Sequence, residues 1–437
     1  MSSSSNLNES QTKAVVTCLR KIQCNHKPSV ELIWGPPGTG KTKTVSVLLF
    51  KLLRTNIRTL ACAPTNVAVT EVASRVLKLT KESFENSLFC SLGDILIFGN
   101  KDRLKVGADI VEVYLDYRVD RLIECFGPLT GWRYCFTSMI DFLEDCVSHY
   151  HIFLENELRK EKSCSNEGGS TKEEVFMKNE LSSNECGSSK KVDKSFIEFA
   201  RDRFKATAGP LRRCVRIFCT HLSKDFILEQ NFQNMVDLIR LLDSFESLLS
   251  KDNVVPEELE KLFSHQEAVQ DSSPSFSDSS NLLYMSRGEC LSVLKILRGS
   301  LNKLSLPSGM NEGLIKEFCF KMASLIFCTA SSSYKLHSAN MKPLDLLVID
   351  EAAQLKECES TIPLQLPGIR HAILIGDECQ LPAMVSSKVR NCCMLILPFH
   401  CLLKNFLVFF LKFCFLFVIF FNSFNSPFSF CFLKLGF

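Results

Sequence analysis

The feature that most constrains this chain is a short apolar run that leads directly into a glycine-rich loop. The run covers residues 30–34, and the loop after it reads Gly35-Pro36-Pro37-Gly38-Thr39-Gly40-Lys41-Thr42. Glycines suit such a loop because backbone without side chains can wrap closely round an anion and point its N–H groups at it. A helix over about 41–54 would add its positive N-terminal end. The pattern predicts a phosphate-binding loop between a strand and a helix; the alternative is a Gly-Pro turn before an ordinary helix.

The loop predicts ATP and Mg²⁺ as cofactors. Lys41 would reach the β- and γ-phosphates, and Thr42 would place its hydroxyl on Mg²⁺. The residues that we expect to bind the nucleotide are Gly35, Pro36, Pro37, Gly38, Thr39, Gly40, Lys41 and Thr42.

Composition limits the class of protein more than its fold. The 437 residues leave room for two or three domains. The formal charge of +3 is close to balance, so any nucleic acid would bind through local contacts rather than a global basic field. The 21 cysteines form no C-x-x-C pair or zinc-like cluster, and the first residues show no signal-peptide pattern. We therefore expect free thiols in a reducing compartment.

Apolar strand patterns alternate with helical patterns on both sides of a long middle segment. The strand patterns cover residues 58–63, 323–330, 344–349 and 372–377, with a helical pattern over about 64–79 after the first. This alternation predicts an α/β fold with a parallel, doubly wound sheet, in which ligands bind at the carboxyl ends of the strands.

The middle of the chain, residues 93–322, is interpreted as a mostly helical insertion. Residues 160–194 and 271–281 are rich in serine and other polar residues, which predicts disordered linkers. A basic cluster lies between these linkers, and it fits either contact with a phosphate backbone or an ordinary solvated helix face. Its members are Arg201, Arg203, Lys205, Arg212, Arg213 and Arg216.

Two carboxylates follow the strand pattern at 344–349. Asp350 would bind Mg²⁺, usually through water, and Glu351 would polarise the attacking water as a general base. Alone, such a pair is most often a charge pair at a helix N-terminus. Gln380 lies beyond the next strand. Its neutral side-chain amide can both donate and accept hydrogen bonds, so it could sense whether a γ-phosphate is present. Together with the loop, these residues predict phosphoryl-transfer chemistry.

Three polar positions each allow two interpretations. Gln11 lies in a predicted helix over about 7–21, and its amide suits either an adenine edge or a plain surface position. Thr65 and Asn66 follow the strand pattern at 58–63, where they would either cap the next helix or contact a ligand.

Four motifs in order carry a resemblance to a known family. They are the loop at 35–42, Pro64-Thr65-Asn66, Asp350-Glu351-Ala352-Ala353-Gln354 and Gly376-Asp377-Glu378-Cys379-Gln380-Leu381-Pro382. Over roughly residues 7–389 the chain resembles superfamily 1 helicases of the senataxin and nonsense-mediated-decay type. The resemblance implies a RecA-like P-loop NTPase domain that hydrolyses ATP and moves on single-stranded RNA or DNA. Hexameric AAA-type ATPases share the loop, but their Asp-Glu strand normally follows much sooner.

The resemblance also implies a compartment, partners and roles for single residues. It favours the nucleus over the cytoplasm and adds RNA-processing proteins as candidate partners. Gln11 would contact adenine, and Gln380 would contact the γ-phosphate. The catalytic set would be Lys41, Asp350, Glu351 and Gln380, with Thr42 and Asp350 on Mg²⁺ and with Thr65, Asn66 and Thr329 along the single-strand track.

The implied domain plan places one RecA-like domain around the insertion. Residues 1–92 and 323–390 would form its two parts, and residues 93–322 would form the insertion. The family pattern ends near residue 390, without a second RecA-like domain whose arginines would complete the ATP site. We therefore expect weak ATP hydrolysis and weak, salt-sensitive single-strand binding from this chain alone. The alternative functions are a non-catalytic, nucleotide-dependent interaction module and a membrane-anchored P-loop ATPase.

Residues 391–437 have a composition unlike the rest of the chain. They contain no Asp or Glu and fourteen of the chain's 35 phenylalanines. Translated T-rich non-coding sequence has this composition, so we expect an aberrant tail from a misplaced gene-model end. The alternative is a membrane anchor over 402–421, where Lys412 near the centre would oppose insertion by roughly 2.5 to 3.5 kcal/mol. We therefore expect no membrane association.

Overall fold

The chain divides into two compact units, each of which is described by itself. The computed structural model describes residues 7–23, 27–55, 57–84, 87–165, 194–251, 254–263, 278–307, 309–377 and 429–435. Unit 1 holds the chain up to residue 127, residues 216–229 and the chain from 307 onward. Unit 2 holds residues 128–215 and 230–306. The domain boundaries at 92, 322 and 390 stay a prediction.

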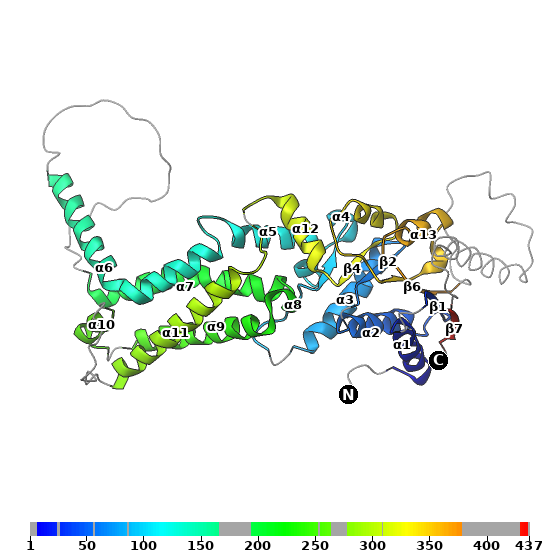
Figure 1. Ribbon diagram of the computed structural model, residues 1–437, viewed down its shortest axis with the longest axis horizontal. Helices are drawn as coiled ribbons and strands as arrows, with labels where there is room; N and C mark the ends of the chain where they lie inside the picture. Colours follow the sequence, from blue (N-terminus) through cyan, green and yellow to red (C-terminus); the bar gives the residue numbers. More distant parts are fainter. Residues whose placement is uncertain are drawn as a thin grey trace, which may run out of the picture. The chain divides into compact units, whose positions relative to one another are not determined.

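Unit 1 is built on one parallel sheet (Figure 1). Every described pair of neighbouring strands runs parallel, which confirms the predicted α/β fold with a parallel sheet. In sheet order the seven described strands are β3 (Ile95–Ile97), β4 (Leu325–Thr329), β2 (Thr59–Ala63), β5 (Leu346–Ile349), β6 (His371–Gly376), β1 (Ser29–Trp34) and β7 (Ser429–Lys434).

The helices of unit 1 cover this sheet. On one face α1, α2 and α3 share a core with alternating strand residues such as Ile33, Phe327 and Val348. Strands β2, β4, β5 and β6 are buried along their whole length, as expected of a parallel sheet with covered faces. The helices are α1 (Glu9–Ile22), α2 (Lys41–Leu53), α3 (Asn66–Glu82), α4 (Lys101–Leu104), α5 (Leu115–Phe126), α8 (Lys224–Ile227), α12 (Glu312–Met322) and α13 (Glu357–Leu364), with 3₁₀ turns η1 (Val111–Val113), η2 (Ser331–His337) and η3 (Ala352–Gln354).

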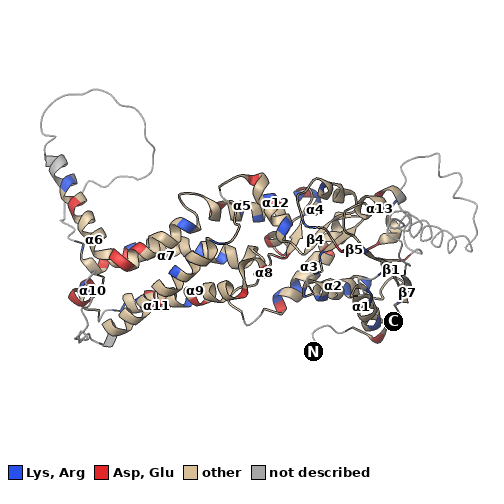
Figure 2. Ribbon diagram, in the orientation of Figure 1, with Lys and Arg blue, Asp and Glu red and all other residues tan. Residues whose placement is uncertain are grey.

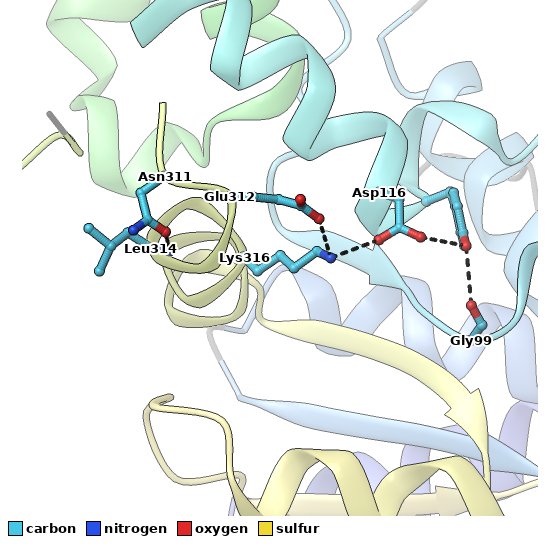
Figure 3. A network of polar contacts seen from close by, with 7 residues as sticks. Gly99, Asp116, Asn311, Glu312, Leu314 and Lys316 are labelled. Carbon is cyan, nitrogen blue, oxygen red and sulfur yellow. Dashed lines mark hydrogen bonds and ion pairs between the residues drawn. The ribbon is translucent and has the colours of Figure 1, made fainter. Parts of the chain in front are cut away.

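A polar network joins α5 and α12 at the carboxyl end of β3 (Figure 3). Lys316 Nζ lies 2.5 Å from Glu312 Oε1 and 3.5 Å from Asp116 Oδ1. The Tyr114 hydroxyl lies 2.8 Å from Asp116 Oδ2 and 3.1 Å from the carbonyl oxygen of Gly99. The network therefore fastens both helices to the backbone that leaves β3.

Unit 2 is helical within the described residues. Its helices are α6 (Trp132–Ser165), α9 (Glu229–Leu249), α10 (Pro256–Phe263) and α11 (Asp278–Leu301), and the division between the units falls within α7 (Phe196–His221) and at the first residue of α9. Phenylalanine rings form its centre: Phe142 lies 5.8 Å from Phe204 and 5.4 Å from Phe263, measured between ring centroids. Such contacts stabilise beyond the apolar area that they bury.

The predicted basic cluster lies on α7, where Figure 2 colours Lys and Arg blue. Two of its arginines contact residues on or just after α9. Arg212 lies 2.8 Å from carboxylate oxygens of both Asp243 and Glu246 on α9. Arg201 donates to the carbonyl oxygens of Leu249 and Lys251. These two arginines therefore hold α9 against α7, whereas the side chains exposed to solvent are those of Arg203, Lys205, Arg213 and Arg216.

Strand β7 was not predicted, because it lies in the segment expected to be aberrant. It pairs in parallel with β1, and Leu435 after it is buried against the core of unit 1. The predicted anchor alternative at 402–421 lies outside the described residues. Among the described helices, none is long and apolar enough to cross a bilayer. The described cysteines are free thiols, as expected.

Glu31 is a charged residue at a fully buried position of β1. Neither carboxylate oxygen accepts a well-formed hydrogen bond from the described residues, although the Cys431 thiol on β7 lies close enough to favour the charged form. Burial raises the pKa of Glu31 to about 7, against a smaller opposing effect of Lys21. A buried carboxyl without full solvation is most stable in its neutral form.

We predict that Glu31→Gln stabilises the protein above pH 7. The folded state keeps the Glu31 proton that the unfolded chain releases, so the wild-type free energy of unfolding falls as pH rises from about 4.5 to about 7, by up to about 3 kcal/mol. Glutamine does not titrate, so the variant lacks this loss. Urea unfolding at pH 5 and pH 8 measures the effect. Glu289→Gln, at an exposed position of α11, is the control, and equal pH dependence of wild type and Glu31→Gln contradicts the prediction.

Candidate nucleotide-binding site

The loop between β1 and α2 takes a backbone path that only glycine fits well. Gly38 has φ +84° and Gly40 has φ +76°, both in the left-handed region. A Cβ on Gly40 would lie 2.6 Å from Gln11 Nε2, and a Cβ on Gly35 would lie 2.5 Å from Thr39 Oγ1. The loop is therefore closed by contacts that a larger residue would break.

Lys41 points into the curve of this loop. Its Nζ donates to the carbonyl oxygens of Gly35 at 2.8 Å and Pro36 at 3.4 Å, and the residue is 7% exposed. Thr39 closes the turn, since its hydroxyl donates to the Pro36 carbonyl at 2.8 Å. Thr42 is half-buried in the first turn of α2. The loop thus holds a cation at the N-terminal end of a helix, which is an arrangement suited to phosphate.

Gln11 connects α1 to the loop. Its Nε2 donates to the Thr39 carbonyl at 2.8 Å, and its Oε1 accepts from the Asn8 N–H at 3.0 Å. The Asn8 side chain accepts from the Gln11 N–H in return, so the two residues form a capping box. The alternative of a surface glutamine is wrong, because Gln11 is 7% exposed. The bond from Gln11 to the loop was not predicted, although the capping-box spacing of Asn8 and Gln11 is visible in the sequence.

Asp350 lies at the carboxyl end of β5, and it is 4% exposed. Its Oδ1 accepts from the Glu351 N–H at 3.0 Å. Burial raises the pKa of Asp350 to about 7, and the nearby charge of Glu351 contributes a smaller part of this rise. The Lys41 cation opposes it. The structure therefore brings the predicted lysine and carboxylates into electrostatic reach of one another.

Glu351 has a left-handed backbone, with φ +51°, although it is not a glycine. Such a conformation is strained for most residues and is found often at functional sites. Its Oε2 accepts from Gln354 Nε2 at 3.1 Å, which orients the carboxylate. A Cβ on Gly376 would lie 3.1 Å from the Ala353 nitrogen, so the end of β6 passes closely beside this turn. Gln380 lies outside the described residues.

The predicted nucleic-acid residues lie at one edge of the sheet. The end of β4 follows the end of β2 in register, and the Ala330 N–H donates to the Ala63 carbonyl at 3.0 Å. The Thr65 hydroxyl accepts from the Ala68 N–H, which confirms the capping alternative. The Thr329 hydroxyl donates to Ser332 Oγ at 2.8 Å. Asn66 is half-buried as the first residue of α3.

Comparisons with known proteins agree with this geometry. A family model described as an AAA domain matches residues 6–388. The human protein named probable helicase senataxin is 32% identical over 134 residues, covering 26% of this chain and 5% of the relative. The ATP-dependent helicase NAM7 of Saccharomyces cerevisiae is 39% identical over 88 residues, covering 18% of this chain and 8% of the relative. The DNA-binding protein SMUBP-2 of Mesocricetus auratus is 39% identical over 121 residues, covering 28% and 12%. The matched parts are thus a small share of each relative's length.

We predict that Gln11→Ala loosens the loop. The variant removes one half of the capping box and a buried hydrogen bond, so the free energy of unfolding should fall by about 1 to 2 kcal/mol. Nucleotide affinity should fall with it, because Thr39 loses its tether. Urea unfolding and titration with a fluorescent ATP analogue measure both effects. Gln23→Ala, at the exposed other end of α1, should change neither; an unaltered Gln11→Ala protein would show that the tether is dispensable.

Proposed function

The chain belongs to the AAA domain family of superfamily 1 helicases of the senataxin and nonsense-mediated-decay type, and on this premise we propose that it binds and hydrolyses Mg²⁺-ATP and acts on single-stranded RNA or DNA. The observation that carries the proposal is the Lys41 ammonium inside a glycine-lined loop, within electrostatic reach of the buried Asp350. A nuclear role beside RNA-processing proteins, which the family resemblance favours, belongs to the same proposal.

The loop fits a polyphosphate. Gly38 and Gly40 take left-handed backbone conformations, which would let successive N–H groups of the loop point at a bound anion. Lys41 already bonds two acceptor oxygens there, and phosphate oxygens would take the same ammonium as stronger partners. Pro36, Pro37, Gly38 and Thr39 would complete the enclosure of the phosphates through the backbone.

The carboxylates fit a metal-assisted hydrolysis. Thr42 and Asp350 would hold Mg²⁺, which neutralises phosphate charge when bound. Asp350 with a pKa of about 7 is readily ionised beside a cation. Glu351, held by Gln354, would accept the proton of the attacking water as general base. Gln380 is assigned to the γ-phosphate in the same proposal.

We predict that Lys41→Ala abolishes nucleotide binding at working concentrations. The variant loses charge-assisted hydrogen bonds to phosphate, so affinity should fall about a hundredfold. Titration with a fluorescent ATP analogue measures it in the full chain. Lys51→Ala, at an exposed position of α2, is the matched control and should bind as the wild type does. Unchanged affinity in Lys41→Ala would mean that the nucleotide binds elsewhere.

We predict that Glu351→Gln separates binding from turnover. Glutamine keeps the size and the contact with Gln354 but cannot accept the proton, so hydrolysis should fall by about 10² to 10⁴ while ATP affinity is kept. Phosphate release with and without single-stranded RNA measures turnover. Hydrolysis at the wild-type rate in the variant argues against Glu351 as the base. Tight ATP binding without turnover in the wild type would instead favour the non-catalytic interaction module.

A further inference from the structure

Exposed apolar side chains remain at the sheet edge where the single-strand track was predicted. The Thr65 hydroxyl accepts from the Ala68 N–H, and the Thr329 hydroxyl donates to Ser332 Oγ, so both hydroxyls already form a hydrogen bond within the protein. Val67 is 65% exposed in the first turn of α3, and Tyr334 is 59% exposed in η2. These two segments follow neighbouring strands, β2 and β4.

Tyr334 is presented by a fixed element. Its neighbours Ser333 and Leu336 are buried, and the Ser333 hydroxyl donates to the Ala330 carbonyl at 2.6 Å. His337 Nε2 lies 3.3 Å from the Ile362 carbonyl oxygen on α13, which holds the far end of η2. Since the inward positions of η2 are filled, Tyr334 and Lys335 face solvent. Within the described residues the tyrosine ring stacks on no other ring, and Lys335 forms no ion pair.

An exposed ring followed in the sequence by an exposed lysine matches the chemistry of a single strand. Each base offers a flat apolar face that stacks on an aromatic side chain, and each phosphate attracts a cation. A docked protein would instead need a continuous apolar patch. The exposed residues beside Tyr334 on η2 are polar ones, Ser331, Lys335 and His337, which favours the nucleic acid.

We propose that Tyr334 is a base-stacking platform for single-stranded nucleic acid and that Lys335 contacts an adjacent phosphate. The inference rests on the proposed action on single strands. It adds a stacking contact with a base, which a threonine hydroxyl cannot make. Because every base has a stacking face, this contact is tolerant of sequence.

The test compares strands with and without bases. Fluorescence anisotropy at low salt would measure binding of the full wild-type chain to an oligouridine and to an abasic strand of the same length. Stacking on one ring should make the oligouridine bind about tenfold more tightly. Tyr334→Ala should lose this preference, and Tyr334→Phe should keep it because the ring is retained. Tyr284→Ala, a similarly exposed tyrosine on α11, is the matched control and should keep the preference.

The outcomes separate the stacking role from the proposed function. If the wild type binds neither strand at low salt, action on single strands is wrong and the stacking role falls with it. If the wild type binds and Tyr334→Ala keeps the preference for oligouridine, only the stacking role is overturned. Equal weakening toward both strands in Tyr334→Ala also overturns it, since the ring would then support the fold of η2.

Discussion

The candidate site depends on one constraint, the common direction of the strands. Parallel strands bring all their carboxyl ends to one edge, so residues far apart in the chain meet there. Along this edge, in sheet order, lie Thr329 at the end of β4, Thr65 after β2, Asp350 after β5, Gly376 at the end of β6 and the phosphate loop after β1. A reversed strand would send its terminal residue to the opposite edge. The convergence of lysine and carboxylates therefore follows from topology before any side chain contact is considered.

At that edge of the sheet, most of the candidate functional groups form hydrogen bonds with other groups of the protein. Lys41 bonds loop carbonyls, Gln11 bonds the loop and its cap, and Asp350 accepts from the next backbone N–H. These bonds fix the groups in place, which lowers the cost of ordering them around a ligand. Asp350 and Glu351 are adjacent like charges in a buried place, and Lys41 opposes their repulsion. A bound cation would act in the same direction as Lys41.

The sequence predicted those parts of the fold that a local pattern determines. The apolar runs before Gly35, Thr65, Thr329 and Asp350 each became a strand, because a central parallel strand must be apolar on both faces. Local sequence patterns could not predict contacts between segments that lie far apart in the chain. No prediction was made for the burial of Glu31, which pairs with Cys431 of the distant strand β7. The engagement of the Thr329 hydroxyl by Ser332 likewise depends on the turn geometry after β4, which no spacing rule determines.

The long helical excursion leaves the sheet continuous because its two ends are held together. The chain leaves unit 1 after α5, re-enters it over residues 216–229 and returns for the last time before α12. Helices α5 and α12 are joined through Lys316 and Asp116 at the end of β3. Bringing the two ends of a long excursion together costs little more entropy than closing a short one, since the cost of loop closure grows only with the logarithm of loop length. Residues inserted beyond this pair would therefore leave the strand order unchanged, and β3 and β4 can remain neighbours although residues 98–324 separate them in the chain.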